Sequence, residues 1–164
     1  MCELVPLDTV APDKVEKLLD AAFGLGRFGR TAYLLRKRSR PIAALSFAIL
    51  DKDEPIGSIQ CWPVLIGDFP IVLVGPVAVT PDLQGQGIGH QLMHAMLDAA
   101  AQNGEPVMVM IGDPEYYGRF GFTSTLTAGW SLPGPWEPRR LLARNARGVA
   151  TPPSGMLEED ERAL

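Results

Sequence analysis

The sequence predicts an α/β domain in which helices flank a mixed, mainly antiparallel twisted sheet. Two observations support this class: three consecutive strand-like runs are separated by short polar turns, and a later helical segment lies between two apolar runs. Hairpin-linked strands pair antiparallel, whereas a strand–helix–strand unit gives a parallel, right-handed crossover. The 164 residues, 46% of them hydrophobic, suffice for one core, so we expect residues 1–164 to form a single domain.

The first predicted elements are a short strand and two helices. An apolar run at residues 4–7 is typical of a strand. From Pro12 to Phe23, apolar residues recur at three- and four-residue intervals, which predicts an amphipathic helix. A glycine-rich turn then leads into a second short helix at residues 31–36.

The central strands are predicted at residues 43–50, 56–65 and 71–79. The third run contains Gly75-Pro76, and because proline has no N–H to donate, this pair predicts a bulge or a break in pairing. The period then becomes helical from Gly87 up to a stop at Asn103-Gly104, before a strand at residues 107–111 and, after a proline-rich stretch, another at 140–145. The acidic end, residues 158–162, is predicted to be a solvated or frayed tail.

Composition argues against several classes of protein. Fifteen Lys and Arg against nineteen Asp and Glu give a net charge of −4, so nucleic acid is not expected as the main partner. Cys2 and Cys61 match neither a disulfide framework nor a metal-ligand spacing, so we expect no metal and a reducing, cytoplasmic location. The N-terminus lacks a signal-peptide pattern, and the longest apolar stretch, residues 70–79, is far shorter than the about 20 residues of a membrane span.

The most informative stretch is residues 77–89, where a strand ends and a helix begins. Gly85, Gly87 and Gly89 stand at alternate positions in the connecting loop. Glycine lets an anion approach the backbone closely, and the unpaired amides and dipole of a helix start attract phosphate. The stretch therefore predicts a phosphate cradle.

Spacing separates three kinds of phosphate loop. A nucleotide P-loop needs Lys followed by Ser or Thr after its last glycine, where this chain has His90 and Gln91. The dinucleotide fingerprint needs a glycine at position 90 or 92, and neither position holds one. The pattern that remains is Gln84-x-x-Gly87-x-Gly89, which resembles the pyrophosphate loop of the GNAT acyl-CoA transferase superfamily.

A second element strengthens this resemblance. Residues 113–122 are similar to the Tyr-x-x-x-Gly-Phe element that follows the fifth strand in GNAT proteins, with Tyr117 as its tyrosine. Together with residues 76–101 they look like the YhbS-type branch of GNAT N-acetyltransferases. The resemblance implies a GNAT-type sheet with a splayed central strand pair, and Gly75-Pro76 stands where such relatives carry a bulge.

The resemblance also implies an activity. An N-acyltransferase of this kind moves an acetyl or other acyl group from acyl-CoA directly to an amine through a tetrahedral intermediate, and acetyl-CoA is the expected donor. Pantetheine would pair with the backbone of residues 77–79, where an N–H near Val77 would hold the oxyanion. Tyr117 would protonate the departing thiolate, because a phenol stays protonated at neutral pH; the alternative is that it only packs beside other aromatics. The residues expected to bind the co-substrate are Val77, Ala78, Val79, Gln84, Gly85, Gln86, Gly87, Ile88 and Gly89.

Several alternatives stay open. The general base is Glu54, Asp113 or Glu115. Many relatives carry Asn where this chain has Met110, so that cofactor contact is either absent or supplied by Asp113. The run of six basic residues from Arg27 to Arg40 is either a solvated turn with structural ion pairs or a surface for an acidic partner.

The partners follow the same alternatives. The acceptor is expected to be a small-molecule or peptide amine, and the protein a monomer or a homodimer. The rival functions are a non-catalytic acyl-CoA-binding sensor on the same scaffold, and an acyltransferase that takes its acyl group from acyl carrier protein.

Overall fold

The computed structural model describes residues 2–161 of the chain. The chain divides into two compact units, and strands β3 (Glu54–Ile66) and β4 (Phe69–Val79) each contribute to both. Among the described residues, unit 1 comprises residues 2–28, Pro41–Cys61 and Gly75–Gly104, and unit 2 comprises Gly29–Arg40, Trp62–Val74 and residues 105–161.

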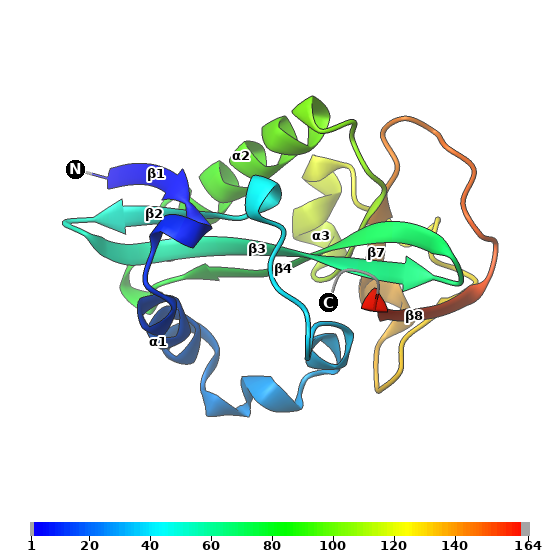
Figure 1. The fold of residues 1–164 in the computed structure, drawn as a ribbon, viewed down its shortest axis with the longest axis horizontal. Helices are drawn as coiled ribbons and strands as arrows, with labels where there is room; N and C mark the ends of the chain where they lie inside the picture. The colour runs from blue at the N-terminus through cyan, green and yellow to red at the C-terminus, as the bar shows by residue number, and fades with distance from the viewer. Residues whose placement is uncertain (1, 162–164) are drawn as a thin grey trace. The chain divides into compact units, whose positions relative to one another are not determined.

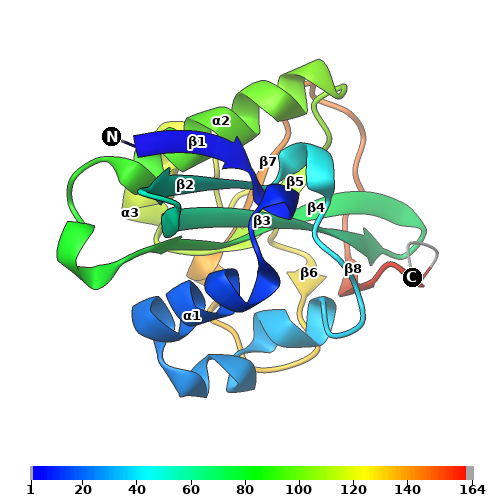
Figure 2. The same ribbon diagram turned by 60° about the vertical axis from the view of Figure 1, so that its left-hand side comes forward.

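Unit 1 is a sheet with one long helix on each face. Its strands follow the order β1-β2-β3-β4, with β1 antiparallel to β2 and β2 antiparallel to β3. Figures 1 and 2 show α1 and α2 on opposite sides of these strands. The elements that unit 1 adds to its parts of β3 and β4 are β1 (Cys2–Pro6), α1 (Pro12–Phe23), β2 (Phe47–Asp51) and α2 (Ile88–Gln102).

Helix α1 forms the core of unit 1 with one face of the sheet. Proline stands at the start of α1, where its missing N–H costs nothing, and the helix is followed by Gly24, whose φ of 77° favours glycine. Its buried Leu18 and Leu19 belong to the same apolar cluster as Ala48 of β2 and Ala78 of β4. The predicted helix from Pro12 to Phe23 is therefore confirmed.

Unit 2 holds the other ends of β3 and β4 in a sheet of order β8-β3-β4-β5-β7. In this sheet β4 runs parallel to β5, while β5–β7 and β3–β8 are antiparallel. A large apolar cluster, which includes Trp62, Val109 and Trp130, forms its core. The remaining elements of unit 2 are β5 (Met108–Ile111), α3 (Pro114–Tyr117), β6 (Trp130–Ser131), β7 (Leu141–Arg144) and β8 (Gly155–Glu159).

The predicted fold class is confirmed: the sheet is mixed and mostly antiparallel, with helices beside it. Two local predictions were less accurate. Residues 43–45 form a 3₁₀ turn instead of the start of a strand, and the predicted helix at 31–36 is a 3₁₀ helix, Thr31–Leu35. Both segments are short, so tertiary packing decides their conformation more than local preference does.

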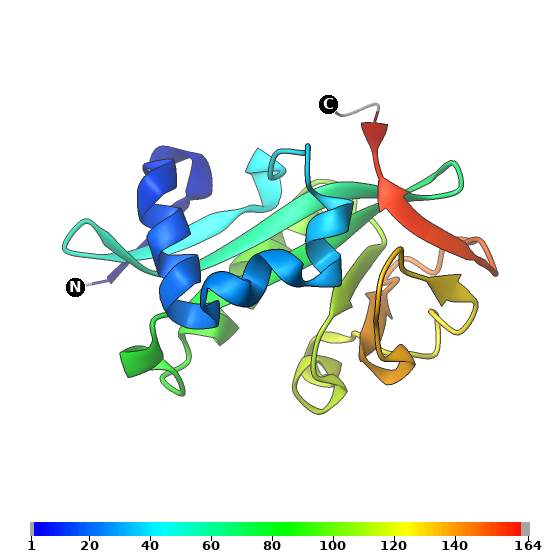
Figure 3. The same cartoon turned by 90° about the horizontal axis from the view of Figure 1, so that it is seen from below.

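The proline-rich C-terminal region differs more from the prediction. Besides β7 it contains β6 and β8, which lie side by side and pair in parallel (Figure 3). The predicted solvated or frayed acidic end is confirmed only for the exposed side chains of Glu158 and Glu161. It is wrong for the rest: residues 158 and 159 belong to β8, Asp160 is buried, and Glu159 accepts hydrogen bonds from the backbone N–H and the Nε of Arg38. Arg162, the last residue of that prediction, lies outside the described residues.

Candidate functional site

The glycine loop of unit 1 connects the end of β4 to α2 through a 3₁₀ turn, Pro81–Leu83. Gly85 and Gly87 have φ values of 83° and 85°, in the left-handed region that L side chains rarely adopt. Residues 84–87 are all exposed, and space is open beside both glycines. The loop therefore presents its backbone to solvent, as phosphate binding requires.

The amides at the start of α2 have the polarity needed for an anion. Gly87 is the N-cap, and no side chain caps the helix. The N–H of Gln91 donates to the carbonyl of Gly87 at 3.0 Å, and the N–H groups of a helix's first turn point outward from its start. The side chain of Gln84 links the loop to the end of β4, since its Nε2 donates to the carbonyl of Val79 at 3.4 Å. These groups fit a pyrophosphate.

The end of β4 is an edge strand within unit 1. Ala78 is buried toward α1, while Val77 and Val79 are half-buried. The parallel register with β5 contains only Val72–Met108 and Leu73–Val109, so it ends before Gly75-Pro76. The predicted break in pairing is thus present. Residues 77–79 lie beyond the pairing with β5, so the edge of β4 that faces away from β3 is not used by that pairing there.

Gly57 of β3 is a residue of this unit that the sequence analysis missed. A Cβ at position 57 would stand 2.6 Å from Cγ2 of Ile88 and 3.1 Å from Cδ1 of Leu92. Both side chains belong to the first half of α2, so glycine at 57 lets the helix start pack directly on the strand. An isolated glycine inside a strand pattern signals such a close approach and was the available clue.

Tyr117 lies in unit 2, at the end of the short helix α3. Its ring is half-buried, and it meets the ring of Tyr116 edge to face at a centroid distance of 4.8 Å. Desolvation, with smaller contributions from Tyr116 and Asp113, raises the pKa of Tyr117 to about 12, although Arg140 opposes the rise. The phenol therefore remains protonated across the physiological range.

The candidate bases all have structural partners. The carboxylate of Asp113 caps α3 by accepting the N–H of Glu115 at 3.1 Å. Glu115 also forms an ion pair with Arg139, and its interactions with Asp113 and this arginine hold the pKa of Glu115 below its usual value. In unit 1, exposed Glu54 pairs with Lys14 at 3.2 Å. A lowered pKa makes Glu115 a weak proton acceptor.

Cys61 and Met110 contribute no polar group. Cys61 is fully buried, and desolvation raises the pKa of its thiol, so it is not an acyl-carrying nucleophile. Met110, at the position of the relatives' Asn, is 2% exposed in β5 and has a thioether with no N–H to donate.

Three of the six basic residues from Arg27 to Arg40 make structural contacts. Arg27 is 3% exposed and pairs with two carboxylates of α1. Arg36 is also buried and lies over the rings of Tyr33 and Trp62, at 3.9 and 4.8 Å from their centroids. Arg38 binds two carboxylates of the C-terminal segment. These contacts favour the interpretation as a turn with structural ion pairs.

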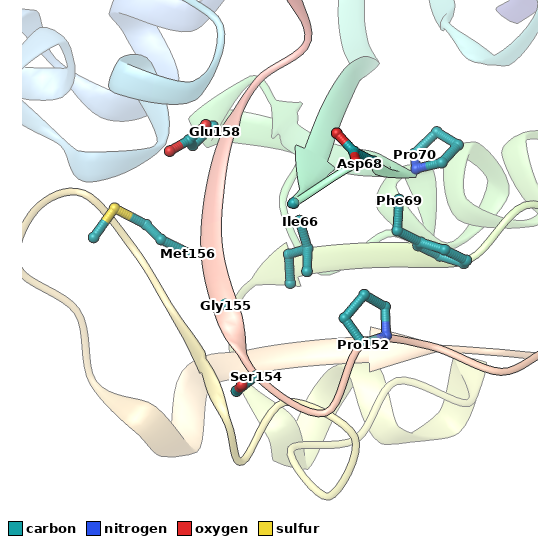
Figure 4. Close-up of a pocket in the computed structure, with 10 residues that line it drawn as sticks. Ile66, Asp68, Phe69, Pro70, Pro152, Ser154, Gly155, Met156 and Glu158 are labelled. Carbon is teal, nitrogen blue, oxygen red and sulfur yellow. The ribbon is translucent and has the colours of Figure 1, made fainter.

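An open pocket of about 610 Å³ lies in unit 2 between the β3–β4 turn and β8. In Figure 4, Ile66 and Phe69 extend toward Pro152, whereas Met156 and Glu158 lie on the other side of the β8 ribbon. Its charged lining residues, Asp68 and Glu158, are acidic, which disfavours the phosphates of CoA. None of the predicted site residues lines this pocket.

Metal-ligand groups and membrane-spanning helices were sought among the residues that the structure describes. Among residues 2–161, no group of three or more His, Cys, Asp or Glu side chains is arranged to hold a metal ion, although the rings of His90 and His94 lie 4.7 Å apart. Within the same residues, no helix has the length and apolar content needed to cross a membrane.

Comparison with known proteins points to one family. Residues 43–124, half of the chain, match the acetyltransferase (GNAT) domain. The uncharacterized N-acetyltransferase YhbS of Escherichia coli K12 is 36% identical over 74 residues, and this match covers 44% of each chain. The match thus spans less than half the length of that curated relative.

Solved structures show the same fold. The crystal structure of E. coli YhbS in complex with CoA has a TM-score of 0.73 and 24% identity, covering 98% of this chain and 89% of that one. A GNAT family acetyltransferase from Brucella melitensis, in complex with acetyl-CoA, has a TM-score of 0.70 and 24% identity, covering 98% and 97%. The chain belongs to the GNAT acetyltransferase family.

Proposed function

We propose that this protein transfers an acetyl or other acyl group from acyl-CoA to a small-molecule or peptide amine, with residues 1–164 acting as one functional domain. The observation that carries the proposal is the exposed glycine loop at the start of α2, next to the edge of β4. Relatives of the same fold have been crystallised with CoA and acetyl-CoA. Cys61 and Cys2 are free thiols, which supports a reducing, cytoplasmic location.

The backbone of unit 1 would bind the co-substrate. The amides from Gln84 to Gly89 would hold the pyrophosphate, and residues 77–79 would pair with the pantetheine arm as an added strand does. Acyl-CoA supplies an activated thioester. A backbone N–H near Val77 would stabilise the oxyanion when the amine attacks the carbonyl carbon.

Side chains would then handle the proton transfers, with Tyr117 of unit 2 as the donor. When the C–N bond has formed and the C–S bond breaks, the hydroxyl of Tyr117 would donate its proton to the thiolate and regain one from water. The high pKa of Tyr117 supports a donor that is always protonated. The proton lost by the amine would go to Asp113 or Glu54 directly or through water; the lowered pKa of Glu115 makes that carboxylate a weaker acceptor than an ordinary glutamate.

The first experiment is a thermal-shift comparison of acetyl-CoA, CoA, NADH and ATP. A ligand at 100 times its Kd adds about 2.7 kcal/mol and raises the Tm of a chain of this size by roughly 5–10 °C. We expect a shift with the CoA ligands and none with NADH or ATP. Shifts with ATP or NADH instead would contradict the assignment of the loop.

An activity measurement separates the transferase from a sensor. Free CoA is titrated with a thiol reagent while panels of small amines and peptides are screened with acetyl-CoA. A transferase releases CoA only when an accepted amine is present. Binding of acetyl-CoA without release in any panel, together with a wild-type affinity in Tyr117→Phe, would favour the sensor.

A further inference from the structure

Gly112 forms the turn between β5 and α3, and the ring of Tyr117 lies directly against it. A Cβ at position 112 would stand 2.8 Å from both Cδ2 and Cε2 of Tyr117, closer than real Cβ atoms approach ring carbons. Gly112 does not have a positive φ, so its backbone conformation is open to any residue. Glycine is therefore required at this position for space, and the space is occupied by the tyrosine ring.

The turn at Gly112 is held by Arg140, the residue that precedes β7. The N–H of Gly112 donates to the carbonyl of Arg140 at 2.9 Å, and Nε of Arg140 donates back to the carbonyl of Gly112 at 3.3 Å. Gly112 is buried. Because its backbone is bonded on both sides, it cannot retreat from a larger side chain without breaking these bonds.

The ring of Tyr117 is enclosed by more than Gly112. Tyr116 packs edge to face against it, and Cε of Met110 would lie 3.4 Å from the same Cβ position. A methyl group at 112 must therefore displace the ring of Tyr117, the one neighbour within 3.0 Å that can rotate away.

We infer that Gly112 is a positioning residue for Tyr117: its missing side chain and its paired bonds with Arg140 hold the ring in one orientation. This inference rests on the proposed function, in which the Tyr117 hydroxyl is the proton donor. It assigns a role to a backbone position that touches no reacting atom.

The test compares Gly112→Ala with Gly118→Ala. Gly118 lies in the same segment and has the backbone conformation of a right-handed helix, with a φ of −56°. No atom lies within 4 Å of its Cβ position, so alanine fits there. A misplacement of about 1 Å costs on the order of 10²-fold in rate. We expect Gly112→Ala to lower kcat by about that factor with the Kd for acetyl-CoA unchanged, and Gly118→Ala to match wild type.

Two readouts separate positioning from general damage. In the ligand-free protein, ultraviolet titration of the phenols should show that the pKa of Tyr117 falls from about 12 toward its usual value in Gly112→Ala, because the displaced ring gains solvent. The double variant Gly112→Ala/Tyr117→Phe should be no slower than Tyr117→Phe alone. The inference would be overturned if the two kcat losses multiplied in the double variant, or if Gly112→Ala kept a wild-type kcat.

A second variant covers the case in which Gly112→Ala does not fold. Arg140→Lys keeps the charge but removes the Nε bond to Gly112. It should lower kcat several-fold, and Arg140→Lys/Tyr117→Phe should be no slower than Tyr117→Phe alone; a wild-type kcat in Arg140→Lys would overturn the inference. If Tyr117→Phe itself keeps wild-type turnover, the proposed proton donor fails. The titration of ligand-free Gly112→Ala then still decides whether Gly112 seats the ring.

Discussion

Units 1 and 2 supply different kinds of chemistry. The candidate binding groups of unit 1 are backbone amides of a strand edge, a loop and a helix start, whereas those of unit 2 are the side chains around Tyr117. Backbone groups depend on chain conformation, so glycines with left-handed φ matter in unit 1. Side-chain chemistry depends on burial and neighbours, so desolvation matters in unit 2.

The two units nevertheless share one device. In each, a glycine without a positive φ leaves room for a functional neighbour: Gly57 for the start of α2, and Gly112 for the ring of Tyr117. Binding of the co-substrate and proton donation should therefore separate by unit. Changes in unit 1 should alter affinity for acyl-CoA, and changes around Tyr117 should alter turnover.

The largest effect is expected from Tyr117→Phe. Removal of a general acid lowers rates by about 10²–10⁴-fold, so kcat should fall within that range while the Kd for CoA stays unchanged. Steady-state kinetics and calorimetric titration measure the two quantities. Tyr116→Phe, which keeps the edge-to-face ring, is the matched control; equal losses in both variants would assign the effect to packing.

Gly57→Ala should disturb unit 1 next most strongly. The added methyl meets Ile88 at 2.6 Å, and overpacking of this kind costs about 1–3 kcal/mol of stability. We expect a Tm lower by several degrees and weaker binding of CoA, with kcat at saturation preserved. Gly26→Ala, whose Cβ position is open, should be neutral; a normal Tm and Kd in Gly57→Ala would refute the close-packing argument.

Gly87→Ala should affect binding with little change in the core. The left-handed conformation costs an L-residue about 1–2 kcal/mol, so if the loop relaxes away from it, the Kd for acetyl-CoA should rise about tenfold. Isothermal titration measures this change. An unaltered Kd would show that the φ of 85° is not needed for the bound loop.

The smallest effect is expected from alkaline pH. Since the pKa of Tyr117 is raised to about 12, its hydroxyl stays protonated between pH 8 and 10 and kcat should show no loss from this group there. Between about pH 10 and 12 the folded protein keeps the proton of Tyr117, whereas an unfolded chain loses it. The free energy of unfolding is therefore unaffected by this group below pH 10 and falls as the pH rises from 10 toward 12. The absorbance difference at 295 nm between wild type and Tyr117→Phe checks the midpoint, and a value near 10 would contradict the burial argument.

Much of this protein was predictable because its signals are local. The helix from Pro12 to Phe23 follows from apolar spacing and a terminal glycine, and the conformations of Gly85 and Gly87 agree with the alternate-glycine pattern. Such signals operate between residues that are close in the chain, where backbone preference and periodicity decide the outcome. The fold class and the position of the glycine loop therefore follow from local signals in the chain.

Tertiary structure decided the features that depend on distant residues. The first two residues of the acidic end become part of β8 because Leu157 enters the core and Glu159 binds Arg38. Gly57 and Gly112 acquire their roles only when α2 and Tyr117 pack against them. No periodicity encodes these contacts, because desolvation and steric exclusion arise only between surfaces that folding brings together.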